Sequence, residues 1–224
     1  MAAPADPVRT LGNAAPARQV LYGHLADLLT YPSEDLVAAL RDGSLVSSLR
    51  RAAAAVPYDV VVSDPGGGGE WVLGGEAGLG PAYIRLFDIP SGGRPCPLYG
   101  GALDGDRREV MEDLLRYYRH FGLSVAHADE RDLPDSVPTV VEFLSYLVFR
   151  EAEASDDAAA DPFRRAQHDV LDRHLARWAP LIQQRVAALD PPPLYAQATS
   201  LLVDVSSGER AVLATALAGS TGGS

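Results

Sequence analysis

The chain has 224 residues, of which 47% are hydrophobic, and its formal net charge is −11 at pH 7. This length and composition predict one folded domain with its own core and exclude wholesale disorder. The strong negative charge disfavours nucleic-acid binding, because phosphate groups would be repelled.

The apolar residues give no sign of a membrane span or of secretion. No stretch approaches the roughly 18 consecutive apolar residues that a transmembrane helix needs. The Ala- and Pro-rich segment 1–15 lacks the apolar core of a secretory signal. The single cysteine, Cys96, cannot form an internal disulfide. We therefore expect a cytoplasmic protein in which residues 1–15 form a flexible N-terminal arm.

Helical spacing of apolar residues begins after this arm. The first helix is expected to run over about 16–30, where Tyr31-Pro32 stops it. Ser33 is a suitable N-cap for a short second helix, which Gly43 ends. A third helix is expected over 45–56.

The next stretch is the least helical part of the sequence. Residues 58–63 are β-prone and leave a short strand open. The four glycines 66–69 favour a turn over a phosphate-binding loop, because no Lys-Ser/Thr follows them. Helical spacing resumes near Pro81. A longer helix is expected to begin near Asp104 or Asp106 and to end at Gly122.

The helix that follows Pro134 is expected to be buried inside the bundle. Between Val137 and Phe149 only Thr139, Glu142 and Ser145 are plainly polar. Apolar side chains therefore surround most of the helix axis.

Prolines and glycines divide the C-terminal third. Residues 155–160 are expected to form a loop, Asp161-Pro162 to begin a helix, and Pro180 to kink or break it. A last helix is expected over 194–205, with Gly208 allowing one more short helix before a flexible tail at 219–224. The chain is thus predicted to be all-α. Residues 16–218 form a single-domain helical bundle of about eight to ten helices, since the βαβ alternation of an α/β fold is missing.

Motifs of familiar enzyme chemistry are missing from the sequence. His168 and His174 are six residues apart and would point in different directions on one helix, and no HExxH is present. GxSxG, Walker A and a helix-opening GxGxxG are absent as well. Cys96 lies between two prolines without a CxxC partner, which favours a packed thiol over a nucleophile. The sequence therefore predicts no catalytic residue, no metal site and no bound cofactor.

Several short segments follow one another in a distinctive order. They are Tyr83–Phe87 (YIRLF), Pro97–Gly100 (PLYG), Tyr117–Leu123 (YYRHFGL), Asp132–Pro138 (DLPDSVP) joined to Val141–Leu147 (VEFLSYL), and His174–Pro180 (HLARWAP). In this order they resemble the redox-enzyme maturation chaperones of the TorD/DmsD/NarJ family. The resemblance covers roughly residues 20–205, and its most specific part is the Leu-Pro-Asp segment joined to the Glu-Phe-Leu helix.

The sequence departs from this family at two places. Ser136 stands where the family commonly has histidine, and Pro81-Ala82 stands where a glutamate commonly precedes the Tyr-x-x-Leu-Phe segment. These departures concern the residues that the resemblance assigns to client binding more than they concern the expected fold. The Pro-Leu-Tyr-Gly-Gly loop is similar to that of the chaperones accompanying nitrate reductases and the ethylbenzene, dimethylsulfide, chlorate and selenate oxidoreductases.

The resemblance implies an all-helical cytoplasmic chaperone that catalyses nothing itself. Its partner would be the N-terminal region of the apo catalytic subunit of a molybdoenzyme. The chaperone would hold that subunit back from export or misassembly until its molybdopterin guanine dinucleotide cofactor is inserted. No nucleic-acid partner and no membrane insertion are expected, and self-association is left open.

The candidate client-binding residues combine aromatic and polar side chains: Tyr83, Phe87, Tyr99, Asp135, Ser136 and Glu142. Asp135 and Glu142 are seven apart, so both would lie on nearly one face if they share a helix. Two such carboxylates could bind a client arginine or backbone N–H groups. The alternatives are an N-cap for Asp135, a buried hydrogen bond or ion pair for Glu142, and core packing for the aromatic residues.

Two other classes of function remain as alternatives. The first is a small helical enzyme, a hydrolase or a nucleotide-using one, against which the missing motifs argue. The second is a permanent helical subunit of a redox complex, which would copurify with the mature enzyme and not only with its precursor.

Overall fold

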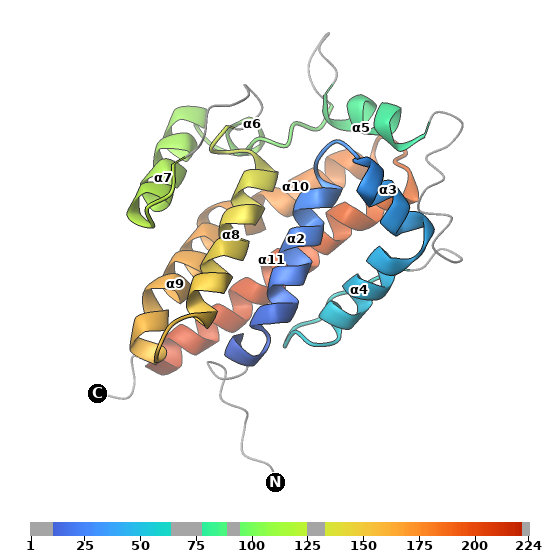
Figure 1. The fold of residues 1–224 in the computed structure, drawn as a ribbon. Helices are drawn as coiled ribbons and strands as arrows, with labels where there is room; N and C mark the ends of the chain where they lie inside the picture. Colours follow the sequence, from blue (N-terminus) through green and yellow to red (C-terminus); the bar gives the residue numbers. More distant parts are fainter. Residues whose placement is uncertain (1–10, 64–77, 89–94, 125–132, 221–224) are drawn as a thin grey trace.

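The computed structural model describes residues 11–63, 78–88, 95–124 and 133–220. Within these ranges the chain forms ten α-helices, one π-helical turn and no β-strand (Figure 1). In chain order they are α2 (Ala15–Leu28), α3 (Glu34–Arg41), α4 (Ser44–Ala53), α5 (Leu79–Phe87), α6 (Gly100–Leu103), α7 (Arg107–His120), α8 (Val137–Ala152), α9 (Asp157–Val170), the π turn η1 (Leu171–Leu175), α10 (Ala176–Ala187) and α11 (Pro193–Ser220). The expected all-α bundle is confirmed, and the strand left open at 58–63 does not form.

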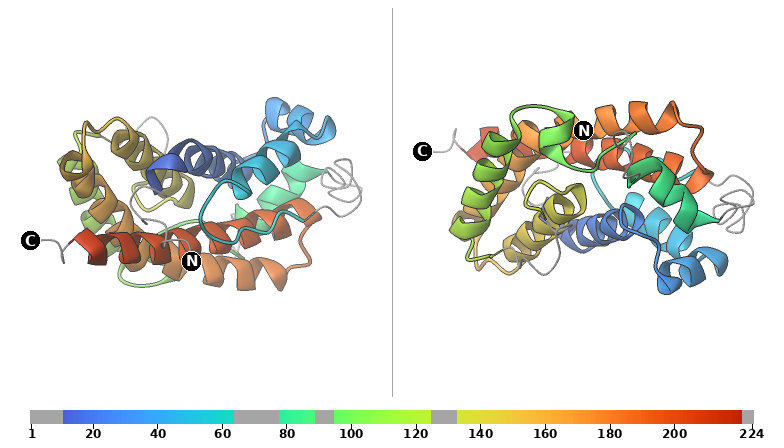
Figure 2. Two further views of the ribbon diagram at one scale, coloured as in Figure 1. Left: turned by 90° about the horizontal axis from the view of Figure 1, so that it is seen from below. Right: turned by 90° about the horizontal axis from the view of Figure 1, so that it is seen from above.

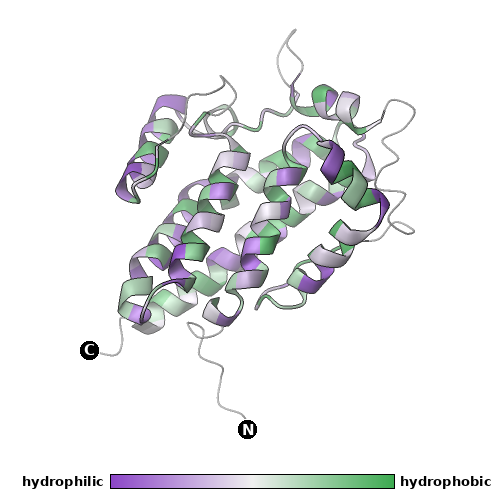
Figure 3. Cartoon of the chain, in the orientation of Figure 1, coloured by the Kyte–Doolittle hydropathy of each residue, from purple (hydrophilic) through white to green (hydrophobic). Residues whose placement is uncertain are grey.

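The long helices lie side by side in the middle of the molecule. Helix α2 lies between α8 and α4, and α11 lies behind α2 with α10 alongside it (Figures 1 and 2). Helix α9 packs against both α8 and α11. Helix α7 lies at one edge and carries many hydrophilic residues (Figure 3). Helix α5 lies near the end of the bundle at which α2 ends and α8 begins.

The burial of α8 follows directly from its sequence and is confirmed. Seven of its apolar side chains are 3% exposed or less: Val137, Val140, Val141, Phe143, Leu144, Leu147 and Val148. Removing each such side chain from water contributes about 1.5–3 kcal/mol before the conformational entropy cost is counted. Packing against α2 and α9 therefore fixes the position of the first turn of α8, which carries part of the site described below.

Several helix ends are set by the capping residues that the sequence indicates. The Ser33 side chain accepts a hydrogen bond from the Leu36 N–H (3.1 Å) and begins α3. Asp106 accepts from the N–H groups of Arg108 and Glu109 and begins α7. Gly122 follows α7 with a φ of 74°, a left-handed conformation that favours glycine. These three predictions are confirmed.

The expected helix start at Asp161-Pro162 is wrong, because α9 begins one turn earlier. The Asp156 side chain accepts from the Ala159 N–H (2.9 Å) and caps the helix there, which leaves Pro162 inside it. Two aspartates compete for the N-cap in this stretch. The alanines 158–160 are strong helix formers and extend the helix back to the earlier one.

Pro180 lies inside α10 and does not end it. The helical path is continuous from Asp157 to Ala187, and its irregular part is the π turn at Leu171–Leu175. Because Pro180 has no N–H, the carbonyl of Ala176 loses its partner at the start of α10, next to the π turn. The helix nevertheless continues through Pro180, so the expected break is absent.

The division of the C-terminal helix at Gly208 is also wrong. Helix α11 runs without a break from Pro193 to Ser220. Glycine is needed at 208 for space: a Cβ there would lie 2.7 Å from Cδ2 of Tyr58. Gly208 thus allows the Tyr58 ring to pack directly on the helix backbone.

Packing at the N-terminus begins earlier than the expected arm allows. Leu11, Ala14 and Ala15 are 3% exposed or less and belong to the core. Residues 1–10 of the arm lie outside the described residues. At the other end, Gly219 and Ser220 are the last residues of α11, and the remainder of the expected tail lies outside the described residues as well.

A buried charge network joins four of the long helices. Arg18 of α2 is completely buried, and its guanidinium donates to Glu151 of α8 (2.9 Å) and to Glu209 of α11 (2.7 Å). The same guanidinium bonds the side-chain oxygen of Gln167 on α9. Each carboxylate has a further donor. Arg164 bonds Glu151 at 2.9 Å, and the Tyr58 hydroxyl bonds Glu209 at 2.9 Å. The network fixes the relative positions of α2, α8, α9 and α11, because its bonds hold only at one register.

Candidate functional site

A pocket of about 350 Å³ opens at the end of the bundle where α2 stops and α8 starts. Four separate parts of the chain supply its walls: the residues after α2, the end of α5, the segment before α6, and the first turns of α8. The lining residues are Thr30, Tyr31, Tyr83, Phe87, Asp88, Leu98, Tyr99, Ser136, Pro138, Thr139 and Glu142. Five of the six residues predicted from the sequence therefore line one pocket, although they come from segments far apart in the chain.

Aromatic rings form the apolar wall of the pocket. The Tyr83 and Phe87 ring centroids are 5.1 Å apart, and Phe87 meets Tyr195 of α11 edge-on at 5.6 Å. Phe87 is 4% exposed and belongs mostly to the core, whereas Tyr83 is half-buried. The Tyr83 hydroxyl donates to the Leu29 carbonyl (3.3 Å), which ties α5 to the end of α2. The wall is rigid because rings packed in this way lock one another's rotamers.

Backbone hydrogen bonds clamp the Leu98–Gly101 segment onto the turn before α8. The Val137 N–H donates to the Leu98 carbonyl (2.9 Å), and the Gly100 N–H donates to the Asp135 carbonyl (2.8 Å). Tyr99 and Ser136 form an isolated antiparallel bridge between these bonds. This clamp brings Tyr99 and Ser136 together at the pocket.

Asp135 is placed differently from its sequence-based interpretation. It precedes α8, is completely buried, and does not line the pocket. One carboxylate oxygen, Oδ2, accepts the Gly101 N–H at 3.0 Å, while Oδ1 has no hydrogen-bond partner among the described residues. Its carboxylate is therefore bonded neither to the N-terminus of α8 nor to any group at the pocket surface. Asp135 contributes by holding the first two residues of α6, Gly100 and Gly101, in place.

The pocket carries negative charge. Glu142 is exposed on the first turns of α8, and Asp88 is half-buried at the end of α5. Of the eleven lining residues, none carries a positive charge. Because Glu142 is exposed, the burial assumed in the ion-pair alternative for it is not found. Asp135 and Glu142 do not share a helix face, because the helix begins only at Val137. A pocket with aromatic walls and carboxylates at its edge suits a peptide that combines apolar and cationic side chains.

Burial and nearby carboxylates also affect Tyr118, behind the pocket. Its hydroxyl donates to the Pro134 carbonyl at 2.8 Å. Burial raises the pKa of Tyr118 well above its ordinary value, and the negative charges of Asp135 and Glu142 raise it further. The hydroxyl therefore stays protonated and keeps its hydrogen bond to the turn that positions Ser136.

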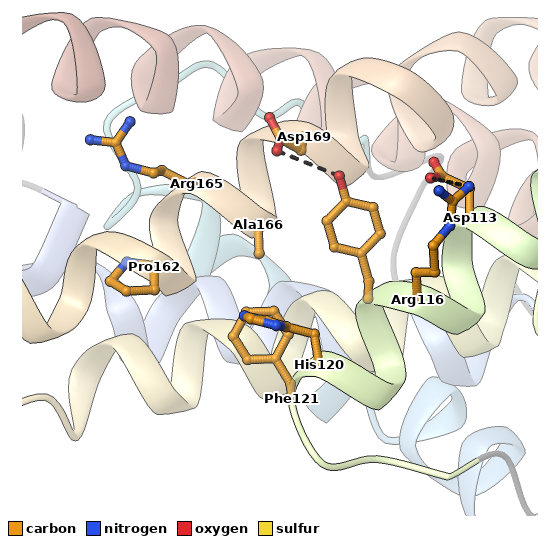
Figure 4. Close-up of a pocket in the computed structure, with 9 residues that line it drawn as sticks. Asp113, Arg116, His120, Phe121, Pro162, Arg165, Ala166 and Asp169 are labelled. Carbon is orange, nitrogen blue, oxygen red and sulfur yellow. Dashed lines mark hydrogen bonds and ion pairs between the residues drawn. The ribbon is translucent and has the colours of Figure 1, made fainter.

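A second hollow, of about 410 Å³, lies between α7 and α9 (Figure 4). Tyr117, Phe121 and Ala166 form its apolar floor. Its charges are matched within the described structure. Arg116 pairs with Asp113 (3.4 Å), and Arg165 pairs with Asp161 (2.9 Å). This hollow therefore favours no particular charge in a ligand.

Asp113, at the edge of this hollow, forms a buried pair with His174 of η1. The His174 Nε2 lies 2.9 Å from Asp113 Oδ2. Burial lowers the pKa of His174, and the opposing effect of Asp113 does not restore it. The pair ties α7 to the π turn with a neutral imidazole at neutral pH.

The remaining chemical features are few. The Cys96 thiol is buried and lies 3.8 Å from the Ile182 carbonyl, and burial raises the pKa of Cys96 to about 11. Cys96 is therefore a protonated packing residue at neutral pH. Among the described residues, no three His, Cys, Asp or Glu side chains gather as a metal ion would require. No helix in that part of the chain has the length and apolar character to cross a membrane.

Comparison with known proteins identifies the family. The family model described as nitrate reductase delta subunit matches residues 75–183. The chlorate reductase assembly chaperone of Ideonella dechloratans is 32% identical over 79% of this chain and 79% of its own length. The chain belongs to the family of redox-enzyme assembly chaperones.

Other chaperones of this family are similar over shorter stretches. The selenate reductase assembly chaperone of Thauera selenatis is 39% identical over 51% of this chain, and the match spans 60% of its length. The dimethyl sulfide dehydrogenase assembly chaperone of Rhodovulum sulfidophilum is 31% identical over 58% of this chain and 55% of its own length. No solved structure matches the chain.

The region that the chaperone family shares contains most of the pocket. Residues 75–183 include all six predicted site residues and the α5, Leu98–Gly101 and α8 walls. Thr30 and Tyr31 lie outside this region, and sequence reasoning missed both as pocket residues. The only local signal was Tyr31-Pro32, whose proline was interpreted as a helix stop. Asp88, Leu98, Pro138 and Thr139 were also missed, although each lies within three residues of a predicted one.

Proposed function

We propose that this protein is an assembly chaperone for the catalytic subunit of a molybdopterin-dependent oxidoreductase. It binds the N-terminal region of that subunit before the cofactor is inserted, and it acts in the cytoplasm without catalysing a reaction. Support comes from the family, whose members are named as assembly chaperones of selenate, chlorate and perchlorate reductases and of dimethyl sulfide dehydrogenase.

One observation carries the choice of binding site. Tyr83, Phe87, Tyr99, Ser136 and Glu142 were selected from sequence segments spread over about sixty residues, and they line a single pocket. The pocket offers aromatic walls and two carboxylates. A client segment would place an apolar side chain against the rings and a basic side chain near Asp88 and Glu142.

The test is capture of the client from the native host. The tagged wild-type protein is purified from cells grown under conditions that induce molybdoenzymes, and bound proteins are identified by mass spectrometry. We expect an unprocessed, cofactor-poor catalytic subunit. The variant Tyr99→Ala/Glu142→Gln is expected to lose most of this subunit. Arg165→Ala, in the α7–α9 hollow, should retain it and serves as the matched control.

Other results would point to other functions. Recovery of the mature enzyme with all its subunits would favour a permanent subunit of a redox complex. The absence of any molybdoenzyme precursor under several growth conditions would contradict the chaperone proposal. Equal recovery by the wild type and the Tyr99→Ala/Glu142→Gln variant would contradict the placement of the client in this pocket.

A further inference from the structure

Tyr31 is an exposed aromatic residue at the edge of the pocket. It is 54% exposed, which makes it one of five large exposed hydrophobic residues among those described. It follows α2 and lies outside the region matched by the family model. Covering this ring with a partner would remove apolar surface from water, which is favourable.

The Tyr31 ring is held in place by its surroundings. Its centroid lies 5.8 Å from that of Tyr83, with the two planes at 83°, an edge-to-face contact. At Gly80 in α5 a Cβ would approach the Tyr31 hydroxyl oxygen to 2.6 Å, so the tip of the ring lies close against the backbone of α5. Pro32 restricts the Tyr31 backbone to extended conformations. The ring is thus both exposed and preorganised.

The aromatic contacts run without interruption from solvent to the core. Tyr31 touches Tyr83, Tyr83 touches Phe87, and Phe87 touches Tyr195, which is 1% exposed. The outermost ring of such a series is anchored by the others, so little conformational entropy is lost when a partner covers it. Exposed aromatic rings with this support are typical of residues that contribute strongly to binding.

We propose that Tyr31 is a client-binding residue, and that a bulky apolar side chain of the client's N-terminal segment packs against its exposed ring. This inference rests on the proposed function. The occupant is a client segment, because the pocket beside Tyr31 carries the carboxylates of Asp88 and Glu142 and so complements a segment with basic residues near the apolar one. A second copy of this chain, with a net charge of −11, fits an acidic pocket poorly.

The first test measures affinity with full-length protein. The probe is a fluorescein-labelled synthetic peptide with the N-terminal sequence of the catalytic subunit captured above, and binding is followed by anisotropy. We expect Tyr31→Ala to weaken binding by about tenfold or more, and Tyr31→Phe to stay within about twofold of the wild type. Phe149→Ala removes an aromatic residue that is 47% exposed and does not line the pocket, and it should have no effect.

The second test asks whether the client covers this position. Tyr31→Trp places an indole there, while the two native tryptophans, Trp71 and Trp178, provide the same background in the wild type, which is measured in parallel. We expect the peptide to shift the added emission to shorter wavelength and to protect it from acrylamide quenching. An unchanged emission at saturating peptide would overturn the proposal even where the affinities differ.

The outcomes separate this inference from the proposed function. If the peptide binds the wild type and Tyr31→Ala equally, Tyr31 has no role and the chaperone function stands. If the peptide binds neither protein, the N-terminal client site and the role of Tyr31 both fail. Thermal unfolding of each variant shows whether a lost affinity reflects a lost fold.

Discussion

Close packing around Gly100 shows how little freedom the pocket wall has. A Cβ at this position would lie 2.1 Å from Cζ2 of Trp178, a side chain that is itself 1% exposed. The ring cannot move aside without disturbing α10. The position of Tyr99 is therefore set partly by a tryptophan on a distant helix.

Replacing Gly100 with alanine should destabilise the protein. We expect Gly100→Ala to lower the free energy of unfolding by about 1–3 kcal/mol through overpacking. Gly23→Ala is the control, since a Cβ at this exposed position of α2 meets nothing within 4 Å. Gly23→Ala should raise the free energy of unfolding by about 0.5–1 kcal/mol. Urea denaturation measures both, and a neutral Gly100→Ala would show that the Trp178 contact is loose.

Asp135 should matter for stability because of one hydrogen bond. In Asp135→Ala the Gly101 N–H loses its acceptor, and we expect the free energy of unfolding to fall by about 1–3 kcal/mol. Asp135→Asn keeps an oxygen acceptor and should lose less. Chemical denaturation compares the two. An Asp135→Ala variant as stable as the wild type would contradict the structural role assigned to this carboxylate.

At the residue scale, the sequence indicates which residues belong to the candidate site better than it indicates where each of them lies in the fold. Tyr83, Tyr99 and Glu142 could be chosen as site residues because their segments resemble a known pattern. The burial of Asp135 could not be foreseen, because it depends on Gly101, which lies 34 residues away in the chain. Tyr31 was missed for a similar reason, as its exposure and its contact with Tyr83 exist only after α2 and α5 meet.

Among the helices, boundaries set by local bonds were predictable and those set by tertiary packing were not. Ser33, Asp106 and Gly122 act on neighbouring residues, so their patterns indicate helix ends reliably. Gly208 suggests a helix break by its propensity, but the Tyr58 ring occupies the space it leaves. The start of α9 is an exception, because the local cap by Asp156 begins the helix one turn earlier than expected. Packing across the bundle outweighs propensities of about 1 kcal/mol.

The Arg18 network joins the central helices, and its loss should be costly. Arg18→Met leaves Glu151 and Glu209 buried without their main counter-charge. We expect the free energy of unfolding to fall by about 3–5 kcal/mol at pH 7. Arg108→Met is the control. Arg108 pairs with Glu112 on the surface of α7, where water screens the pair and its loss should change the stability little. Equal effects of the two substitutions in urea denaturation would contradict the importance of the network.

The same network predicts a pH dependence. Burial alone would raise the pKa of Glu151, but the attraction of Arg18 and the bonds from Gln167 and Arg164 outweigh burial and lower it below the ordinary 4.5. A carboxyl group whose pKa is lower in the folded state stabilises the protein above pH 4.5. This contribution to the stability is lost as the pH falls through the folded-state pKa. In Arg18→Met, protonation relieves the uncompensated carboxylates. The stability gap to the wild type should therefore narrow between pH 6 and pH 4, and a gap that widens would refute this account.

For the molecule as a whole, the fold class and the order of the helices followed from the sequence. Apolar spacing predicted the buried α8, and the resemblance predicted an all-helical chaperone. The arrangement of the helices around Arg18 could not be predicted, because a single arginine in an amphipathic helix is usually a surface residue. The many charged residues of α7 indicate an exposed helix, but they do not indicate which neighbours it packs against.

The position of each helix should determine how readily it opens. Helices α2 and α8 bury leucines and valines at 0% exposure, whereas α7 exposes Arg107, Arg108 and Glu109 and lies at the margin. We expect the amides of α7 to exchange with deuterium at least about tenfold faster than those of α2 and α8 in the native protein. Hydrogen exchange with mass spectrometry measures this. Equal protection of α7 and α8 would mean that the bundle opens only as one unit.

The clamp between Leu98–Gly101 and the turn before α8 has a consequence for how this family diversifies. Its bonds at Leu98 and Gly100 join main-chain atoms. Every residue carries these atoms, except that proline lacks the amide hydrogen. Side chains at Tyr99 and Ser136 can therefore be exchanged by mutation while the frame that presents them survives. On the proposed function, a lineage can thus acquire a new client by exchanging these two side chains while the backbone bonds that hold them are kept.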